Sequence, residues 1–380
     1  MEPFVYHNPT EILFGPGMIR QVAPRIPQDA KILWVYGSGS IFRNGVADQV
    51  RAALGARPYI EFGGIEPNPE YVTCMRAVEV ARRESVNFVL ATGGGSVLDA
   101  AKFIAAATVY RGEDPWEILR THGEVVTGAL PIGTVLTLPA TGSEANGNSV
   151  ISRRETREKL HFTSAHVFPK FSVLDPEVTR TLPSRYVRNG IVDAFVHVTE
   201  QYITRPANAP LQDRLAEAVL ATLVEVGPRT LRDPSDLDAR ASFMWSTTLA
   251  LNTLLGCGVP EDWATHMIGH ELTALYGMDH AETLAVVLFG VWTYKLSTKR
   301  AKLEQFGRRV WSVVSAEEAM RKTEAFFNSI GMPTRLRDYG VDAAEAAREV
   351  STRFRAHGWA FGEDGDIDAD AVRAILELRR

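Results

Sequence analysis

The first half of the chain alternates short apolar runs with stretches whose apolar residues recur every three or four positions. Continuous apolar runs are typical of buried strands, and the longer period is typical of amphipathic helices. Two late runs, 157–164 and 171–176, indicate a hairpin or edge strands. The other elements predicted in this half are strands at 31–37, 56–62, 87–96 and 130–141, and helices at 46–54, 70–84 and 97–107.

From residue 183 onward, helical spacing continues to the C-terminus without a β-rich run. Strand–helix alternation in the first half predicts an open parallel sheet with helices on both faces. Because 380 residues exceed what one core usually serves, we predict a Rossmann-like α/β domain at 1–182 and an all-α domain at 183–380. The helices expected in the second domain are 185–203, 211–226, 239–255, 263–276, 282–310, 316–330, 343–357 and 369–378.

The composition, with 45% hydrophobic and 23% charged residues, is that of an ordinary globular protein. A net charge of -5 does not indicate the basic surface that binding to nucleic acid or to an acidic membrane requires. The two cysteines, Cys74 and Cys257, fit neither a disulfide framework nor a metal motif, so we expect a reducing cytoplasm. We expect no signal peptide, and the longest apolar run, 284–292, is about half of a membrane span.

Two turns rich in glycine and serine each join a predicted strand to a predicted helix. Backbone N–H groups at such a turn, with the helix dipole behind them, favour a phosphate. Open α/β sheets bind ligands at the carboxyl ends of neighbouring strands, so the two turns together predict a dinucleotide site. The first turn has Phe42 where the third glycine of the dinucleotide fingerprint would stand. The turns are Gly37, Ser38, Gly39 and Ser40, and Gly93, Gly94, Gly95 and Ser96.

The first turn also bears on the choice of nicotinamide cofactor. Sheets that bind NAD usually present a carboxylate to the ribose 2′-hydroxyl. Here no acidic residue follows the turn until Asp48, whereas Ser40 and Arg43 could bind a 2′-phosphate. The sequence therefore predicts a preference for NADPH over NADH.

Three of the nine histidines fall within residues 263–280. His266 and His270 are four residues apart and share one face of a helix. His280 lies fourteen residues after His266, which on a straight helix is about 21 Å. Bonds of about 2 Å to one metal cannot span that distance, so a shared ion requires a break in the helix, and Gly277 is a plausible one.

Asp193 and His197 form a second pair at four-residue spacing, on another predicted helix. Two helices that each offer carboxylate or imidazole at one-turn spacing can enclose a divalent cation. By spacing alone, His266 could share the ion with either His270 or His280. The metalloprotease signature is absent, because Met267 and not a glutamate follows His266.

Four segments together resemble the iron-containing, group III alcohol dehydrogenases, and most closely their branch of NADPH-dependent aldehyde reductases and butanol dehydrogenases. The similarity runs from FGPG (14–17) to the C-terminal helices. It implies the fold shared with dehydroquinate synthase, in which an α/β domain binds the dinucleotide and a helical domain binds a divalent metal in the cleft between them. The segments are GGGSVLDAAK (93–102), LPATGSEAN (138–146), DAFVHVTEQY (193–202) and DWATHMIGHELTALYGMDHAETLA (262–285).

The resemblance also implies roles for individual residues. It identifies Asp193, His197, His266 and His280 as metal ligands, and His270 as a histidine near the nicotinamide that does not bind the metal. Because proton transfer near neutral pH suits an imidazole, His270 is the catalytic candidate that relays a proton. One carboxylate and three imidazoles suit Fe²⁺ or Zn²⁺, and Mn²⁺, Ni²⁺ or Co²⁺ also fit. Relatives that favour NAD carry an aspartate in the first turn, which this chain lacks. The cofactor contacts implied are Gly94, Gly95, Ser96, Asp99, Thr137, Thr141, Ser143, Asn146 and Lys159.

These observations predict a metal-dependent oxidoreductase, an NADP-dependent alcohol dehydrogenase or aldehyde reductase. It would transfer hydride between NADPH and small aldehydes or primary alcohols, as a cytoplasmic homodimer. One alternative is a metal lyase resembling dehydroquinate synthase, which keeps its NAD bound. Another is a non-catalytic nucleotide-binding module with a structural metal, since four protein ligands also suit a closed structural site. The sequence segments DAFVH (193–197) and THMIGHELTALYGMDH (265–280) favour the dehydrogenase.

Overall fold

The computed structural model describes residues 1–380 and divides the chain into two compact units. The α/β unit consists of His7–Pro183 and Asp233–Thr248. The helical unit consists of Met1–Tyr6, Ser184–Arg232 and Leu249–Arg380. One crossing between the units lies beside the predicted domain boundary at 182/183, and the others were not predicted. The division into domains at 182/183 stays a prediction.

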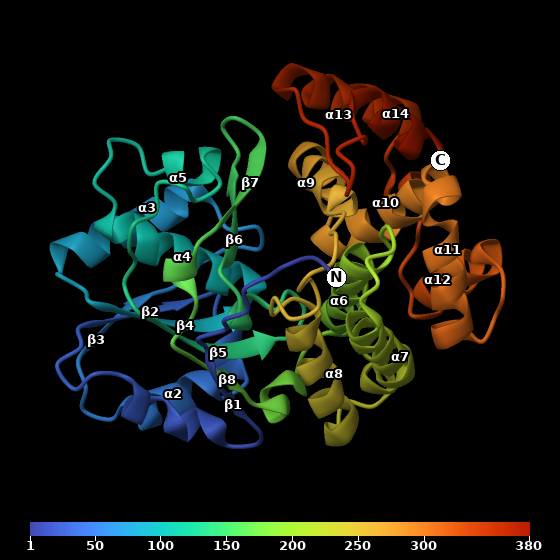
Figure 1. Cartoon of the computed structure of the whole chain (residues 1–380). Coiled ribbons are helices and arrows are strands. Elements are labelled where there is room, and N and C mark those ends of the chain that lie inside the picture. The colour runs from blue at the N-terminus through green and yellow to red at the C-terminus, as the bar shows by residue number, and fades with distance from the viewer. The chain divides into compact units, whose positions relative to one another are not determined.

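The elements of each unit follow the chain as Figure 1 labels them. The strands are β1 (Glu11–Phe14), β2 (Ile32–Tyr36), β3 (Tyr59–Phe62), β4 (Phe88–Gly94), β5 (Ile132–Leu138), β6 (Asn148–Arg153), β7 (Glu158–Thr163) and β8 (Phe171–Leu174). The helices of the α/β unit are α1 (Ser40–Arg43), α2 (Val46–Leu54), α3 (Tyr71–Arg83), α4 (Gly95–Val109), α5 (Glu117–Arg120) and most of α8 (Leu237–Ala250). Those of the helical unit are α6 (Ser184–Tyr202), α7 (Pro210–Arg232), α9 (Ala264–Tyr276), α10 (His280–Tyr294), α11 (Leu296–Phe306), α12 (Ala316–Ser329), α13 (Ala343–His357) and α14 (Ala369–Glu377).

A six-stranded parallel sheet, in the order β1-β8-β5-β4-β2-β3, forms the centre of the α/β unit. Along β2, Leu33 and Val35 belong to the core shared with α3 and α4, whereas Ile32 and Trp34 belong to the core shared with α2. Both faces of the strand are therefore buried, which explains its continuous apolar run. Figure 1 shows α3 and α4 on one face of the sheet and α2 on the other. The predicted α/β class of this half is confirmed.

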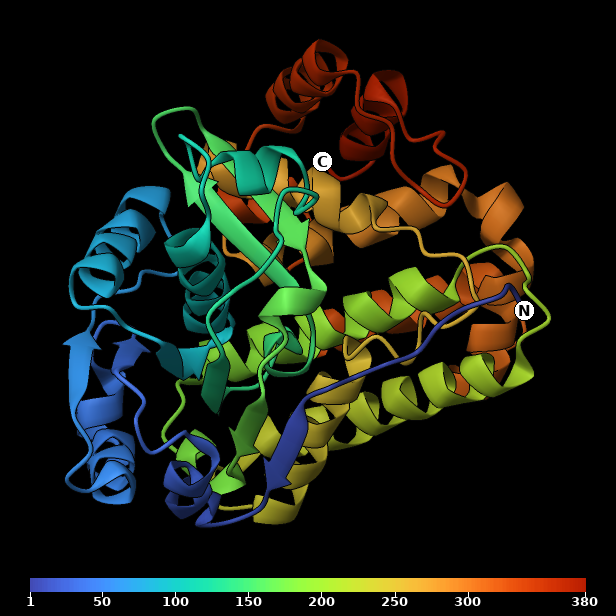
Figure 2. The same cartoon turned by 60° about the vertical axis from the view of Figure 1, so that its left-hand side comes forward.

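One strand prediction is only partly right: the run 157–164 is β7, an edge strand of a two-stranded ribbon, as predicted. The runs 157–164 and 171–176 do not form a hairpin with each other, because β7 pairs antiparallel with β6. The second run is β8, which lies between β1 and β5 and is not an edge strand. Its position in the sheet is set by crossover connections, which a four-residue apolar run does not encode. Figure 2 shows the β6–β7 ribbon in green beside α4, against which β6 packs.

In the helical unit, α10 packs against both α6 and α9. The predicted break between α9 and α10 is confirmed: Gly277 ends α9 with φ 68°, and Asp279 begins α10 with a capping box that includes Glu282. The single helix predicted at 282–310 is instead α10, α11 and a π-helical turn at Gly307–Trp311. None of the helices combines the length and apolar character that a membrane span requires.

Candidate active site

The predicted metal ligands come from three helices of the helical unit. Asp193 and His197 lie one turn apart on α6, His266 lies in the first turn of α9, and His280 is the first residue of α10. The left-handed turn at Gly277 reverses the chain, so His280 comes back toward His266, with ring centroids 5.3 Å apart. Gly277 permits this reversal, because glycine accepts a positive φ at no steric cost.

Three imidazole nitrogens converge on one carboxylate oxygen. Asp193 Oδ1 lies 3.6 Å from His197 Nε2, 3.9 Å from His266 Nε2 and 3.7 Å from His280 Nε2. Donors arranged tetrahedrally around an ion, with bonds of about 2.1 Å, stand about 3.4 Å apart. The spacing therefore fits a single central cation. Asp193, His266 and His280 form a group whose donor atoms all lie within 4.8 Å of one another, and His197 stacks on His266 at 4.6 Å.

Burial supports the same assignment. Asp193, His197 and His266 are each 4 to 5% exposed, and His280 is half-buried. His266 Nε2 is buried and has no hydrogen-bond partner. A buried polar atom without a partner costs about 1–3 kcal/mol, and an ion at the point of convergence would remove that cost. The residues present therefore fit a divalent cation.

The electrostatics of the cluster favour a positive charge at its centre. Burial lowers the pKa of His197 to about 4, which leaves the neutral imidazole that binds metals. Burial alone would also lower the pKa of His266, but the carboxylates of Glu200 and Asp193 outweigh it and raise that pKa to about 9. The cluster thus attracts a proton in the absence of a cation, and a divalent ion at its centre would instead neutralise the charge of Asp193.

His270 lies one turn after His266, and its ring centroid is 5.3 Å from that of His280 and 6.5 Å from that of His266. The side chain is buried. Neither His270 nor His197 is among the three residues whose donor atoms are mutually close, but His197 Nε2 lies 3.6 Å from Asp193 Oδ1. The His270 imidazole is therefore next to the cluster without joining that group.

Two residues at this cluster were missed by the sequence analysis. Glu200, buried on α6, accepts a hydrogen bond from His266 Nδ1. Trp263 precedes α9 with φ 60°, and its ring centroid lies 5.4 Å from that of His266 and 6.3 Å from that of His197. Glu200 follows Asp193 by seven residues, so helical periodicity could have found it. No sequence signal identifies a tryptophan in the left-handed region.

In the α/β unit, the second glycine turn joins β4 to α4. A Cβ atom at Gly93 would lie 2.5 Å from Val97 Cγ2, at Gly94 2.8 Å from Leu138 Cβ, and at Gly95 2.5 Å from Thr141 Cγ2. Each position therefore excludes a side chain. No side chain caps the N-terminus of α4. Its first N–H groups and the helix dipole are thus suited to a phosphate.

The first glycine turn follows β2, which is the neighbour of β4 in the parallel sheet, so both turns lie at the same edge. Gly39 has φ 100°, which favours glycine. Ser40 begins the four-residue helix α1, and Arg43, its last residue, is exposed. Asp48, the first acid after the turn, is an exposed residue near Arg51, 3.9 Å away.

Several polar residues predicted to line the cofactor form hydrogen bonds with one another. Asp99 Oδ1 accepts a hydrogen bond from Ser143 Oγ at 2.6 Å, and Asp99 Oδ2 accepts one from the Val150 N–H at 3.1 Å. The buried Lys102 Nζ donates to Ser143 Oγ at 2.8 Å and to Asn146 Oδ1 at 2.9 Å. Burial lowers the pKa of Lys102 to about 8. These hydrogen bonds stabilise the conformation of residues 142–150 next to α4.

The other predicted cofactor residues surround the same turn. Thr141 Oγ1 accepts a hydrogen bond from the Ser143 N–H at 3.2 Å, and Thr137 is buried near the end of β5. Lys159 Nζ donates to Asn68 Oδ1 at 2.9 Å, and the Asn68 N–H donates to Ser96 Oγ at 3.3 Å. Asn68, with φ 55°, was missed by the sequence analysis and connects Lys159 to the glycine turn.

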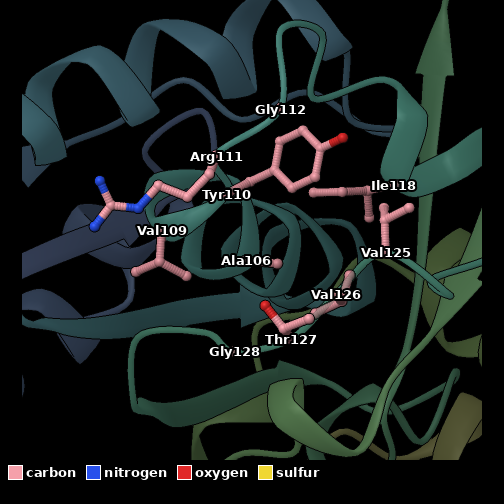
Figure 3. Close-up of a pocket in the computed structure, with 10 residues that line it drawn as sticks. All are labelled: Ala106, Val109, Tyr110, Arg111, Gly112, Ile118, Val125, Val126, Thr127 and Gly128. Atoms are coloured by element: carbon pink, nitrogen blue, oxygen red, sulfur yellow. The ribbon is translucent and has the colours of Figure 1, made fainter.

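Two cavities elsewhere contain none of the predicted residues. One, of about 130 Å³, lies at the C-terminal end of α4, where Ala106 and Val109 help to line it (Figure 3). The other, of about 520 Å³, is an open hollow lined by residues including Arg321 and Arg337 of the helical unit. Neither combines metal-binding donors with a glycine turn, so neither is the candidate site.

Comparison with known proteins identifies the family. The sequence pattern of the iron-containing alcohol dehydrogenases matches residues 9–176, and that of the C-terminal part of the Fe-containing alcohol dehydrogenase family matches 188–377. The chain is 52% identical to the NADPH-dependent aldehyde reductase YqhD of Escherichia coli, with 100% of both chains covered. It is 40% identical to the NADP-dependent alcohol dehydrogenase 3 of Entamoeba histolytica, with 98% of each covered.

Solved structures agree with this relationship. The crystal structure of E. coli YqhD has a TM-score of 0.98, with 100% of this chain and 99% of that chain covered. The NADH-dependent butanol dehydrogenase A of Thermotoga maritima, 35% identical, has a TM-score of 0.94 with the same coverage. The chain therefore belongs to the iron-containing alcohol dehydrogenase family, and the family predicted from its motifs is confirmed.

Proposed function

We propose that this chain transfers hydride between NADPH and small aldehydes or primary alcohols, with the help of a divalent metal. The observation that carries the proposal is the convergence of three imidazole Nε2 atoms on Asp193 Oδ1. A divalent cation would give the buried His266 Nε2 a partner, and the reactions of the named relatives supply a reason to hold one.

Asp193, His197, His266 and His280 would hold the metal. When bound, the metal supplies Lewis-acid polarisation of a carbonyl group and stabilises the negative charge of an alkoxide. One carboxylate and three neutral imidazoles balance only one of its two positive charges, so the protein leaves the site nominally +1. The donor set suits Fe²⁺ or Zn²⁺, and Mn²⁺, Ni²⁺ and Co²⁺ also fit.

His270 is the candidate for moving the proton that alcohol formation requires. An imidazole can give and take protons near neutral pH. The centroid of the His270 ring lies 5.3 Å from that of the His280 ring, so His270 is adjacent to a proposed metal ligand. In the oxidation of an alcohol, the same imidazole would accept the proton.

The α/β unit would bind NADPH. The uncapped N-terminus of α4, with Gly94, Gly95 and Ser96, would take the pyrophosphate. Ser40 and Arg43 would bind the 2′-phosphate. Two relatives are named as NADPH- or NADP-dependent, whereas two proteins of Bacillus subtilis, 39% identical, carry the name "Probable NADH-dependent butanol dehydrogenase". The remaining cofactor candidates are Gly37, Ser38, Gly39, Asp99, Thr137, Thr141, Ser143, Asn146 and Lys159.

The test is NADPH oxidation with butanal and a panel of other aldehydes, on metal-free protein reloaded with Fe²⁺, Zn²⁺, Mn²⁺ or Ni²⁺. We expect metal-dependent turnover that consumes one NADPH per alcohol formed, with a higher kcat/KM for NADPH than for NADH. A lyase would consume no NADPH, and a non-catalytic module would show no turnover. A preference for NADH would refute the role of Ser40 and Arg43.

A cytoplasmic homodimer is part of the same proposal. Family resemblance supports the dimer, and a sequence with only two cysteines, both free, is consistent with a reducing cytoplasm. Light scattering coupled to size-exclusion chromatography measures the mass, and a value of one 41.9 kDa chain would contradict the dimer.

A further inference from the structure

Glu200 continues the ligand-bearing face of α6, since Asp193, His197 and Glu200 follow the helical spacing i, i+4, i+7. Both oxygens of its carboxylate accept hydrogen bonds, and the residue is 3% exposed. Oε2 accepts the hydrogen bond from His266 Nδ1, and Oε1 accepts one from the Thr265 N–H at 2.6 Å. The Glu200 carbonyl also accepts from the Asp262 N–H at 2.9 Å. The residue therefore ties α6 to the start of α9, immediately behind a metal ligand.

These contacts determine which nitrogen of His266 carries the proton. An ionised carboxylate only accepts hydrogen bonds, so the nitrogen that faces Oε2 must be the donor. The carboxylate is held at the N-terminus of α9, where the helix dipole favours its charge. A neutral imidazole protonated on Nδ1 has its lone pair on Nε2, the atom that faces Asp193 Oδ1. Metals bind that lone pair.

We propose that Glu200 is the positioning residue of the metal centre: it fixes the tautomer and orientation of His266 that present Nε2 to the cation. The inference rests on the proposed function, because it assumes a cation held by the four ligands. Carboxylate partners behind a ligating histidine typically change metal affinity by about 10–100-fold. The expected consequence of losing Glu200 is therefore a weaker metal centre rather than an absent one.

The geometry explains why the residue must be a carboxylate. Two donors, His266 Nδ1–H and the Thr265 N–H, converge on one side chain. A glutamine has one acceptor oxygen, so it satisfies one donor and presents its NH₂ group to the other. An alanine leaves both donors without the acceptor. An aspartate keeps both oxygens but is one methylene shorter, so it should restore part of the function.

The experiment measures Zn²⁺ affinity of the full chain by competition with a chromogenic chelator, starting from Zn²⁺-loaded enzyme. We expect the Kd for Zn²⁺ to rise about 10–100-fold in Glu200→Gln and Glu200→Ala, and by less in Glu200→Asp. The matched control is Glu217→Gln, which alters a buried carboxylate in the same unit that accepts from the Tyr202 hydroxyl of α6 at 2.9 Å. The control should bind Zn²⁺ as the wild type does.

Two results would overturn the role of Glu200. One is a Kd for Glu200→Gln equal to that of the wild type, and the other is an equal loss of affinity in Glu217→Gln. Circular dichroism checks the fold of each variant, and if Glu200→Ala does not fold, the Gln and Asp variants decide the question. Wild-type protein that binds none of the metals of the reloading panel would remove the proposed function itself, whereas a wild type that binds one of them with the same Kd as the Glu200 variants removes only this inference.

Discussion

His270 and His280 are neighbours with different surroundings. His280 Nε2 lies 3.7 Å from Asp193 Oδ1 and belongs to the group of close donor atoms, and His270 does not belong to that group. Four-residue spacing alone made His266 and His270 equally good partners for a metal. The position of His280 depends on a reversal at Gly277 that spacing suggests but does not specify. In the sequence, only the family resemblance, and not the local spacing, indicated that His280 binds the metal and that His270 does not.

Replacing these two histidines should have different effects. His280→Ala removes a proposed ligand, so metal content and aldehyde reduction should fall together. His270→Ala should keep the metal and lower kcat by about 100-fold, the usual effect of losing a proton-transfer group. Elemental analysis of purified protein beside steady-state kinetics checks both. Metal loss in His270→Ala would contradict its assignment.

Trp263 offers a test of backbone strain beside the proposed metal ligands. At φ 60°, a residue other than glycine is strained, because its Cβ approaches the backbone. Trp263→Gly and Trp263→Ala both remove the indole, so their difference reports the backbone alone. We expect the glycine variant to be more stable by about 1 kcal/mol, measured by urea unfolding. Equal stability would mean that the backbone relaxes when the indole is removed.

At the scale of elements, the β4–α4 turn was predictable because its sequence and its packing agree. Each glycine is required by a side chain that its Cβ would strike. By contrast, β8 and α8 are set by partners distant in sequence. β8 lies between β1 and β5, and the Arg240 guanidinium of α8 donates to the Thr179 carbonyl at 2.8 Å. Periodicity identifies such an element but not its neighbours.

Gly95→Ala tests the phosphate turn. The new Cβ would lie 2.5 Å from Thr141 Cγ2, so the turn must shift away from the geometry that suits a pyrophosphate. We expect the Kd for NADPH, from fluorescence titration, to rise by at least about tenfold, or about 1.4 kcal/mol. Metal content should not change, because the ligands lie in the other unit. Gly128→Ala is the control, since its Cβ would meet nothing within 4 Å.

At the scale of the whole molecule, the proposed ligands all belong to the helical unit, and both glycine turns belong to the α/β unit. A metal that binds only the folded state stabilises it by about 4 kcal/mol when free metal exceeds Kd a thousandfold. Removing it should therefore weaken one unit more than the other. The sequence indicated two classes of structure along the chain but not the return of α8, because that return depends on tertiary contacts.

Hydrogen exchange can measure this asymmetry. Chelation of the metal should speed amide exchange in α6, α9 and α10 by up to about 10³-fold, since these helices carry the proposed ligands. Exchange in β4 and α4 should change little. A uniform change across both units would show that they open as one cooperative body, and no change would argue against a bound metal.

The interleaved course of the chain restricts how its halves can be recombined with those of relatives. The segments Met1–Tyr6 and Asp233–Thr248 each belong to the unit built mainly from the other half of the sequence. A hybrid joined once near residue 183 would combine a sheet from one parent with an α8 from the other, so Phe14 would lose its native edge contact with Trp245. A hybrid that exchanges both segments along with their units would keep each parental interior intact.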